Sequence, residues 1–137
     1  MVFDINGLKE INDHFGHDAG DKLIIGAAQC IEQCFGSRGK LYRIGGDEFV
    51  VLTHADQEER ITLLVAFEKQ TEAWKENNHL ELHMSYGCVH ASEYSDYSIT
   101  ELGKEADKRM YTAKALYYQE NGRDRRSRKA VSGLPDE

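Results

Sequence analysis

The chain has 137 residues, of which 40% are hydrophobic, so it is long enough for one domain around a single core and too short for two. Its 24 acidic residues outnumber 17 basic ones and give a formal charge of -7, which argues against broad electrostatic binding to nucleic acid. No apolar run approaches the roughly 20 residues of a membrane helix, and the start, MVFDINGLKEIND, lacks the features of a signal peptide. We expect no membrane contact for this segment and a cytoplasmic location.

The first half of the chain predicts two helices between short strands. Gly16 and Gly36 supply helix stops, and Gly45-Gly46 favours a tight hairpin turn because glycine accepts positive φ values. In chain order the pattern predicts a strand, a short helix, a longer helix and two hairpin strands over residues 1–5, 6–16, 18–36, 39–44 and 48–54.

The second half predicts a helix over 55–77, a strand over 80–91 and a last helix that a capping box opens at Ser98. We expect that helix to run to about Glu120, with a short strand or a frayed tail after it. The order of elements predicts an α/β chain of the two-layer α+β type, a mostly antiparallel central sheet flanked by helices with the hairpin in the middle. The three cysteines are expected to be buried free thiols rather than metal ligands.

The stretch YRIGGDEFVVL raises the question why carboxylates stand at a bend between core strands. Asp4 ends the first strand, and if that strand neighbours the hairpin, Asp4 and Asp47 converge and bind Mg²⁺ together with waters and substrate phosphates. The alternative is that Asp47 and Glu48 only solubilise a surface turn. The segment Asn6–Lys9 favours the first interpretation, because a helix N-terminus with a lysine forms an anion seat. A metal site at the edge of a sheet, next to an anion site at a helix N-terminus, suggests that the ligand is a nucleotide.

The motif GGDEF, together with FDINGLKEINDHFGHDAGDKL, MSYGC and EADKRMYTAK, resembles the GGDEF family of diguanylate cyclases from Val2 to about Arg126. The resemblance implies a nucleotide-cyclase and polymerase-palm fold over residues 1–126, with 127–137 as a tail. The implied reaction condenses two GTP into cyclic di-GMP and two pyrophosphates with Mg²⁺ or Mn²⁺. The family's first helix and its D-x-L-T-G-L-x-N-R segment are absent, so we expect a domain that lacks this helix, from a larger protein with an upstream sensory or receiver domain.

By the same resemblance, Asp4, Asp47 and the backbone carbonyl of Ile5 hold the metal, and Asp47 and Glu48 are catalytic. Strand alternation complicates the role of Glu48, because consecutive strand residues point to opposite faces. Each domain would hold one GTP, so turnover would need a homodimer. The alternative is a catalytically silent GTP-binding module that regulates a larger protein. An R-x-x-D feedback motif is missing, since residues 36–39 read Gly-Ser-Arg-Gly.

Resemblance also assigns Asn12 and Asp21 to the guanine, whose N1–H and amino group suit a carboxylate acceptor. A helix-end cap for Asn12 and a solvated acid for Asp21 stay open as alternatives. The remaining implied substrate contacts bind phosphate, and they are Gly7, Leu8, Lys9 and Lys114. A lone helical lysine is usually only solvated. Tyr118 stands where the family commonly has an arginine, and Arg123 or Arg125 are the candidates to replace it.

Overall fold

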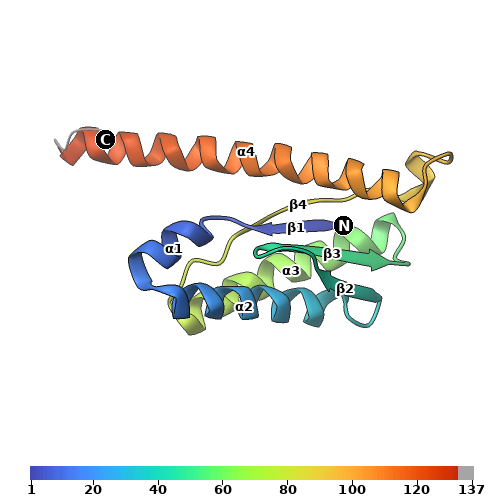
Figure 1. Ribbon diagram of the computed structural model, residues 1–137, viewed down its shortest axis with the longest axis horizontal. Helices are drawn as coiled ribbons and strands as arrows, with labels where there is room; N and C mark the ends of the chain where they lie inside the picture. The colour runs from blue at the N-terminus through green and yellow to red at the C-terminus, as the bar shows by residue number, and fades with distance from the viewer. Residues whose placement is uncertain (133–137) are drawn as a thin grey trace.

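A computed structural model describes the backbone of residues 1–132 and the side chains of residues 1–121. Four strands, four helices and one short 3₁₀ turn follow one another in this part of the chain (Figure 1). In order they are β1 (Val2–Ile5), α1 (Leu8–Phe15), α2 (His17–Phe35), β2 (Gly39–Arg43), β3 (Glu48–Thr53), α3 (Gln57–Asn78), β4 (Met84–Gly87), η1 (Ala91–Glu93) and α4 (Ile99–Ser132).

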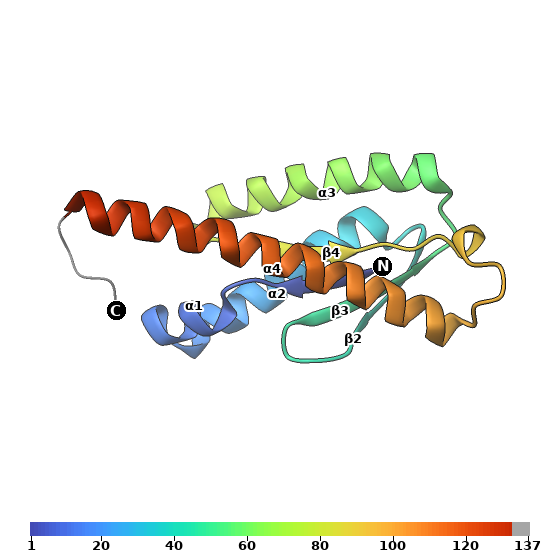
Figure 2. The same ribbon diagram turned by 90° about the horizontal axis from the view of Figure 1, so that it is seen from above.

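The four strands form one antiparallel sheet in the order β2-β3-β1-β4. Helices α2 and α3 cover one face of this sheet, and the long helix α4 crosses the other (Figures 1 and 2). The predicted antiparallel α+β architecture flanked by helices is therefore confirmed. The hairpin is only half central, because β3 lies inside the sheet while β2 forms an edge.

Strand β1 is buried on both faces, and its alternation decides where each side chain points. Phe3 packs against Phe35 and Phe67 under the sheet, with ring centroids 5.7 and 5.2 Å apart. Val2 lies on the opposite face in a small cluster with Met110 of α4. Asp4 shares the parity of Val2, so the sequence pattern VFD turns a carboxylate toward α4.

Helix α4 packs very closely on β4 at Gly87. A Cβ atom added there would lie 2.0 Å from the backbone oxygen of Ala106 and 2.4 Å from the backbone nitrogen of Met110. Only glycine leaves room for backbone at that distance. The missing side chain thus sets the height of α4 above the sheet.

The connection between β2 and β3 differs from the tight turn predicted for Gly45-Gly46. The hairpin is confirmed, but neither glycine adopts a left-handed φ; among the described glycines the positive φ values belong to Gly7 and Gly16. Instead the Arg43 side chain donates to the carbonyl oxygens of Gly45 and Gly46, at 3.1 and 2.9 Å, and holds an open loop over residues 44–47. The side chain of a residue two and three positions before these glycines thus holds the loop, in place of the left-handed glycine conformation that was expected.

Helix α4 also differs from its prediction at its end. Its start is confirmed, because Ser98 Oγ accepts the Glu101 N–H at 3.2 Å. The backbone then stays helical to Ser132, so the expected end near Glu120 and the alternative of a strand after it are wrong. Residues 127–132 of the predicted tail continue the helix, and residues 133–137 lie outside the described part. The domain boundary after residue 126 stays a prediction.

The three cysteines are free thiols: Cys30 is buried, and Cys34 and Cys88 are half-buried. Burial raises the pKa of Cys30 to about 11, which keeps this thiol protonated and chemically quiet. Among the described residues, none of the helices combines the length and apolarity needed to cross a membrane.

Candidate functional site

The two predicted metal carboxylates meet at one rim of the sheet. Asp4, near the end of β1, is paired in register with Glu48, the first residue of β3. The next residue along, Ile5, donates its N–H to the backbone oxygen of Asp47 at 2.9 Å. Asp47 therefore stands just outside the strand beside β1, and its carboxylate is close enough to raise the pKa of Asp4.

Lys114 of α4 supplies the cation that Asp4 needs. Asp4 is only 5% exposed, and Lys114 Nζ lies 2.9 Å from its Oδ1. Burial raises the pKa of Asp4, the Lys114 hydrogen bond and charge oppose that rise, and the net pKa is above its usual value. Burial lowers the pKa of Lys114, but the hydrogen bond and charge of Asp4 outweigh it, so the ammonium is retained. The alternative, that Lys114 is only a solvated side chain, is therefore wrong.

Glu48 faces the same side of the sheet as Asp4, since the two are register partners. Asp47 lies in the loop rather than in the strand, so alternation does not separate the two neighbouring acids, which removes the difficulty raised above. Burial, followed by a hydrogen bond and the charge of Asp107 on α4, raises the pKa of Glu48 to about 7. Sequence reasoning missed Asp107. Its spacing from Lys114, two helical turns, was the available signal that both lie on one face of α4.

The predicted phosphate seat is the turn between β1 and α1. Gly7 precedes α1 with φ 71°, a left-handed conformation that favours glycine. The first N–H groups of α1, around Leu8 and Lys9, have no acceptor inside the helix. Lys9 itself is exposed. The Gly7 N–H donates to the hydroxyl oxygen of Tyr118 at 2.8 Å, a contact from α4 that the sequence did not reveal.

A polar cluster beneath this turn was also missed. Asn6 is 3% exposed, and its amide donates to Ser85 Oγ at 2.8 Å and lies 2.7 Å from His83 Nδ1. The Tyr117 ring stacks on His83 with centroids 4.2 Å apart. Tyr117 therefore contacts the residue before β4, and Tyr118 contacts the turn after β1. Two adjacent tyrosines in a charged helix were the visible signal.

Of the two predicted guanine residues, Asn12 lies where α1 meets α2, and Asp21 lies near the start of α2. Asn12 lies directly over Gly20, where an added Cβ would be 1.8 Å from Asn12 Oδ1. That oxygen is buried and has no hydrogen-bond partner among the described side chains. The Asn12 side chain thus does not cap its helix, and it offers an unused acceptor. Asp21 follows Gly20 directly and is exposed, so its alternative as a solvated acid stays open.

The donors at the rim fit a hard divalent cation that keeps much of its own hydration. Among the described residues, no three His, Cys, Asp or Glu side chains gather as a metal cage would require. Asp4 and Asp47, with the nearby backbone of Ile5, are oxygen donors of the kind that Mg²⁺ uses when waters and substrate phosphates complete its shell. The chemistry of this donor set therefore suits a metal that arrives with a nucleotide.

A cavity of about 1170 Å³ lies between β2, β3 and the first half of α4. Glu48 and Asp107 line it, while Asp4, Asn12 and Asp21 do not. Its size is therefore no guide to where a nucleotide lies. The convergence of carboxylates, ammonium and backbone amides around the end of β1 carries more chemical information.

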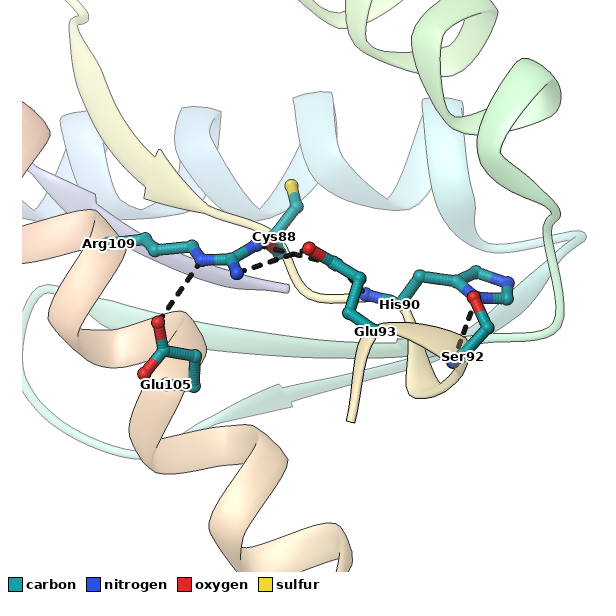
Figure 3. Close-up of polar contacts among 6 residues, drawn as sticks. All are labelled: Cys88, His90, Ser92, Glu93, Glu105 and Arg109. Atoms are coloured by element: carbon teal, nitrogen blue, oxygen red, sulfur yellow. Dashed lines mark hydrogen bonds and ion pairs between the residues drawn. The ribbon is translucent and has the colours of Figure 1, made fainter. Parts of the chain in front are cut away.

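The segment after β4 is tied to α4 through Arg109 (Figure 3). Arg109 Nη1 donates to the Cys88 carbonyl oxygen at 2.7 Å, and the guanidinium pairs with Glu93 at 3.2 Å and Glu105 at 3.4 Å. The Glu93 carboxylate in turn accepts the His90 N–H at 2.7 Å. These bonds help fix the position of α4 along β4, and with it the placement of Asp107, Lys114 and Tyr118.

Comparison with known proteins places this arrangement in a family. The sequence profile described as "Diguanylate cyclase, GGDEF domain" matches residues 1–119. The chain belongs to the GGDEF domain family. Diguanylate cyclase DgcS of Shewanella oneidensis is 30% identical over 115 residues, covering 84% of this chain and 38% of that protein. Diguanylate cyclase DosC of Escherichia coli is 30% identical over 119 residues, covering 83% of this chain and 25% of that protein. The chain thus spans well under half of these curated relatives.

Solved structures of GGDEF domains share the fold. A Pseudomonas aeruginosa structure described as only the GGDEF domain of YfiN matches with a TM-score of 0.75 at 28% identity, covering 84% of this chain and 69% of that chain. A microbial GGDEF domain described as interacting with cyclic di-GMP matches with a TM-score of 0.61 at 33% identity, covering 84% and 71%. The palm-like fold expected for the family is therefore confirmed.

Proposed function

We propose that this GGDEF domain is the catalytic unit of a diguanylate cyclase, which condenses two GTP into cyclic di-GMP and two pyrophosphates. The observation that carries this proposal is the convergence of Asp4 and Asp47 beside Lys114 at the rim of the sheet. The buried carboxylate of Asp4, held beside the partly exposed carboxylate of Asp47 and paired with an ammonium, is costly unless the site serves a cation and an anionic ligand. The neighbouring turn at Gly7 presents amides for that anion.

In this proposal the site residues divide into those that bind the metal, those that bind phosphate and one that takes up a proton. Asp4, Asp47 and the Ile5 carbonyl would hold Mg²⁺ or Mn²⁺, which when bound neutralises phosphate charge. The amides around Gly7 and Leu8, with Lys9 and Lys114, bind the phosphates. Glu48, with a pKa near 7, is suited to take up a proton near neutral pH.

Asn12 and Asp21 select guanine. A carboxylate accepts hydrogen bonds from the N1–H and amino group of guanine, a donor pair that adenine lacks. A polar site that meets an analogue without its partner groups rejects it strongly. The unpartnered Oδ1 of Asn12 supports a ligand at this position. GTP should therefore be preferred to ATP.

Turnover requires two copies of the chain, because each holds one GTP and the 3′-hydroxyl of one nucleotide attacks the α-phosphorus of the other. A strict monomer should bind GTP and make no product. Free thiols and a GTP substrate fit a cytoplasmic domain, and the short coverage of the curated relatives fits a unit within a longer signalling protein.

The test is pyrophosphate release from GTP and Mg²⁺ at a series of protein concentrations, repeated with Asp47→Asn and with ATP. The proposal expects release that rises more steeply than the protein concentration, and none from the variant or from ATP. Equal release by wild type and Asp47→Asn would sink it.

The second candidate is a silent GTP-binding module in a larger protein. It is favoured by one observation, that Tyr118 rather than an arginine lies at the Gly7 amide. In the same assay this candidate gives GTP binding without pyrophosphate at any protein concentration.

A further inference from the structure

The hydroxyl of Tyr118 occupies a backbone N–H of the proposed phosphate site. It accepts the Gly7 N–H at 2.8 Å, although the two residues are 111 positions apart in sequence. Gly7 is the residue before α1, where backbone N–H groups point away from the helix and favour negative charge. An oxygen bound there stands where a phosphate oxygen would stand.

The neighbours of this hydroxyl are those of the proposed phosphate site. Tyr118 lies one turn beyond Lys114 on α4, so both side chains leave the same face of the helix. Lys114 reaches Asp4 at the end of β1, while Tyr118 reaches the turn that follows the same strand. The two α4 side chains therefore hold adjacent parts of one segment.

The contact is suited to being broken. Tyr118 is 38% exposed, so its ring has solvent beside it and can turn away. A phenol is a neutral acceptor, whereas a phosphate oxygen is charged, and hydrogen bonds to charged acceptors are about twice as strong. A phosphate should therefore displace the hydroxyl, although the bond that is lost reduces the net gain.

We propose that the Tyr118 hydroxyl is a displaceable occupant of the phosphate seat, which holds the Gly7 amide in the free protein and must leave when a phosphate-bearing nucleotide binds. This inference rests on the phosphate-binding part of the proposed function. It makes Tyr118 a residue that weakens phosphate binding selectively. A neutral hydrogen bond of the usual strength corresponds to about 2- to 12-fold in affinity.

The test compares Tyr118→Phe with Tyr117→Phe, which removes the hydroxyl of the neighbouring ring that stacks on His83. Calorimetry would measure binding of a non-cyclisable GTP analogue with Mg²⁺, of pyrophosphate and of guanosine. We expect Tyr118→Phe to bind the analogue and pyrophosphate about 2- to 12-fold more tightly than wild type, with guanosine unchanged. Tyr117→Phe should match wild type for all three ligands.

A second measurement follows the Gly7 amide itself. In the free protein its hydrogen exchange should be faster in Tyr118→Phe than in wild type, and the GTP analogue should slow it in both. This readout also reports whether the variant remains folded, because amides of the sheet should keep their protection.

Weaker or unchanged binding of the analogue and pyrophosphate by Tyr118→Phe would overturn the inference, as would unchanged exchange at Gly7. A gain that extends equally to guanosine would do so too, because the effect would then not involve phosphate. Absence of phosphate binding in both proteins would remove the seat and the inference together. By contrast, a phosphate-specific gain without any pyrophosphate release from GTP would keep Tyr118 as the occupant and sink the cyclase activity alone.

Discussion

Replacing Lys114 by methionine tests the pairing on which the site is built. The change removes the ammonium 2.9 Å from Asp4 Oδ1 but keeps most of the apolar stem of the side chain. It leaves a carboxylate that is 5% exposed, with the charge of Asp47 close by. The expected result is a large loss of stability at neutral pH.

The structure sets the size of that loss. Removing one partner of a fully buried ion pair costs about 3–5 kcal/mol. Here the Lys114 side chain is 21% exposed and that of Asp4 is 7% exposed, so solvent screens the pair in part. We therefore expect the free energy of unfolding to fall by about 2–3 kcal/mol, below the fully buried range.

Urea unfolding of the metal-free protein measures this value, because the midpoint shifts while the slope stays constant. The exposed Lys108→Met on the same helix is the control and should stay within about 0.5 kcal/mol of wild type. The double variant Asp4→Asn/Lys114→Met should recover much of the loss, since no charge is then stranded. The loss should also shrink as the pH falls, because burial raises the pKa of Asp4 and a protonated Asp4 no longer needs the ammonium.

Two results would contradict this reasoning. One is a loss under about 0.5 kcal/mol for Lys114→Met, which would mean that the ion pair is as weak as a surface pair. The other is simple additivity of the Asp4→Asn and Lys114→Met effects, which would mean that the two side chains do not interact.

Three further predictions follow from the structure. Burial and Asp107 raise the pKa of Glu48 to about 7 in the folded protein, so protonated Glu48 stabilises the fold fully below about pH 4.5, and this stability is lost as the pH rises through 7. The loss in the free energy of unfolding should be about 1 kcal/mol after solvent screening. Glu48→Gln should remove this pH dependence from unfolding curves measured at a series of pH values. Asp21→Ala should weaken GTP binding at least 10-fold while leaving ATP binding unchanged, and calorimetry that finds equal losses for both nucleotides would refute the guanine assignment. Gly87→Ala should cost about 2 kcal/mol or more because its Cβ meets the backbone of α4, whereas Gly103→Ala, with open space around it, should be neutral or stabilising by up to about 1 kcal/mol.

The sequence predicts those parts of the fold that depend on local pattern. The short apolar, β-rich runs VFDI and EFVVLT are enough to expect two strands, and their antiparallel pairing brings Asp4 near Asp47. The hairpin loop was mispredicted because Arg43, rather than a left-handed glycine, holds it. A rule for tight turns considers the backbone φ preferences of the turn residues and has no term for a side chain that bonds to the carbonyl oxygens of the loop.

The contacts that α4 makes were predicted least well. Lys114 was expected near phosphate on resemblance, but Asp107 and Tyr118 were not placed, since their partners Glu48 and Gly7 are far away in sequence. Helical periodicity shows that residues share a face and says nothing about what that face meets. Only the packing of α4 over β4 and β1 supplies that information.

Asp107, Lys114 and Tyr118 belong to a single rigid rod, and each holds a different piece of the sheet rim or the turn after β1. A small rotation or translation of α4 would therefore weaken all three contacts together rather than one after another.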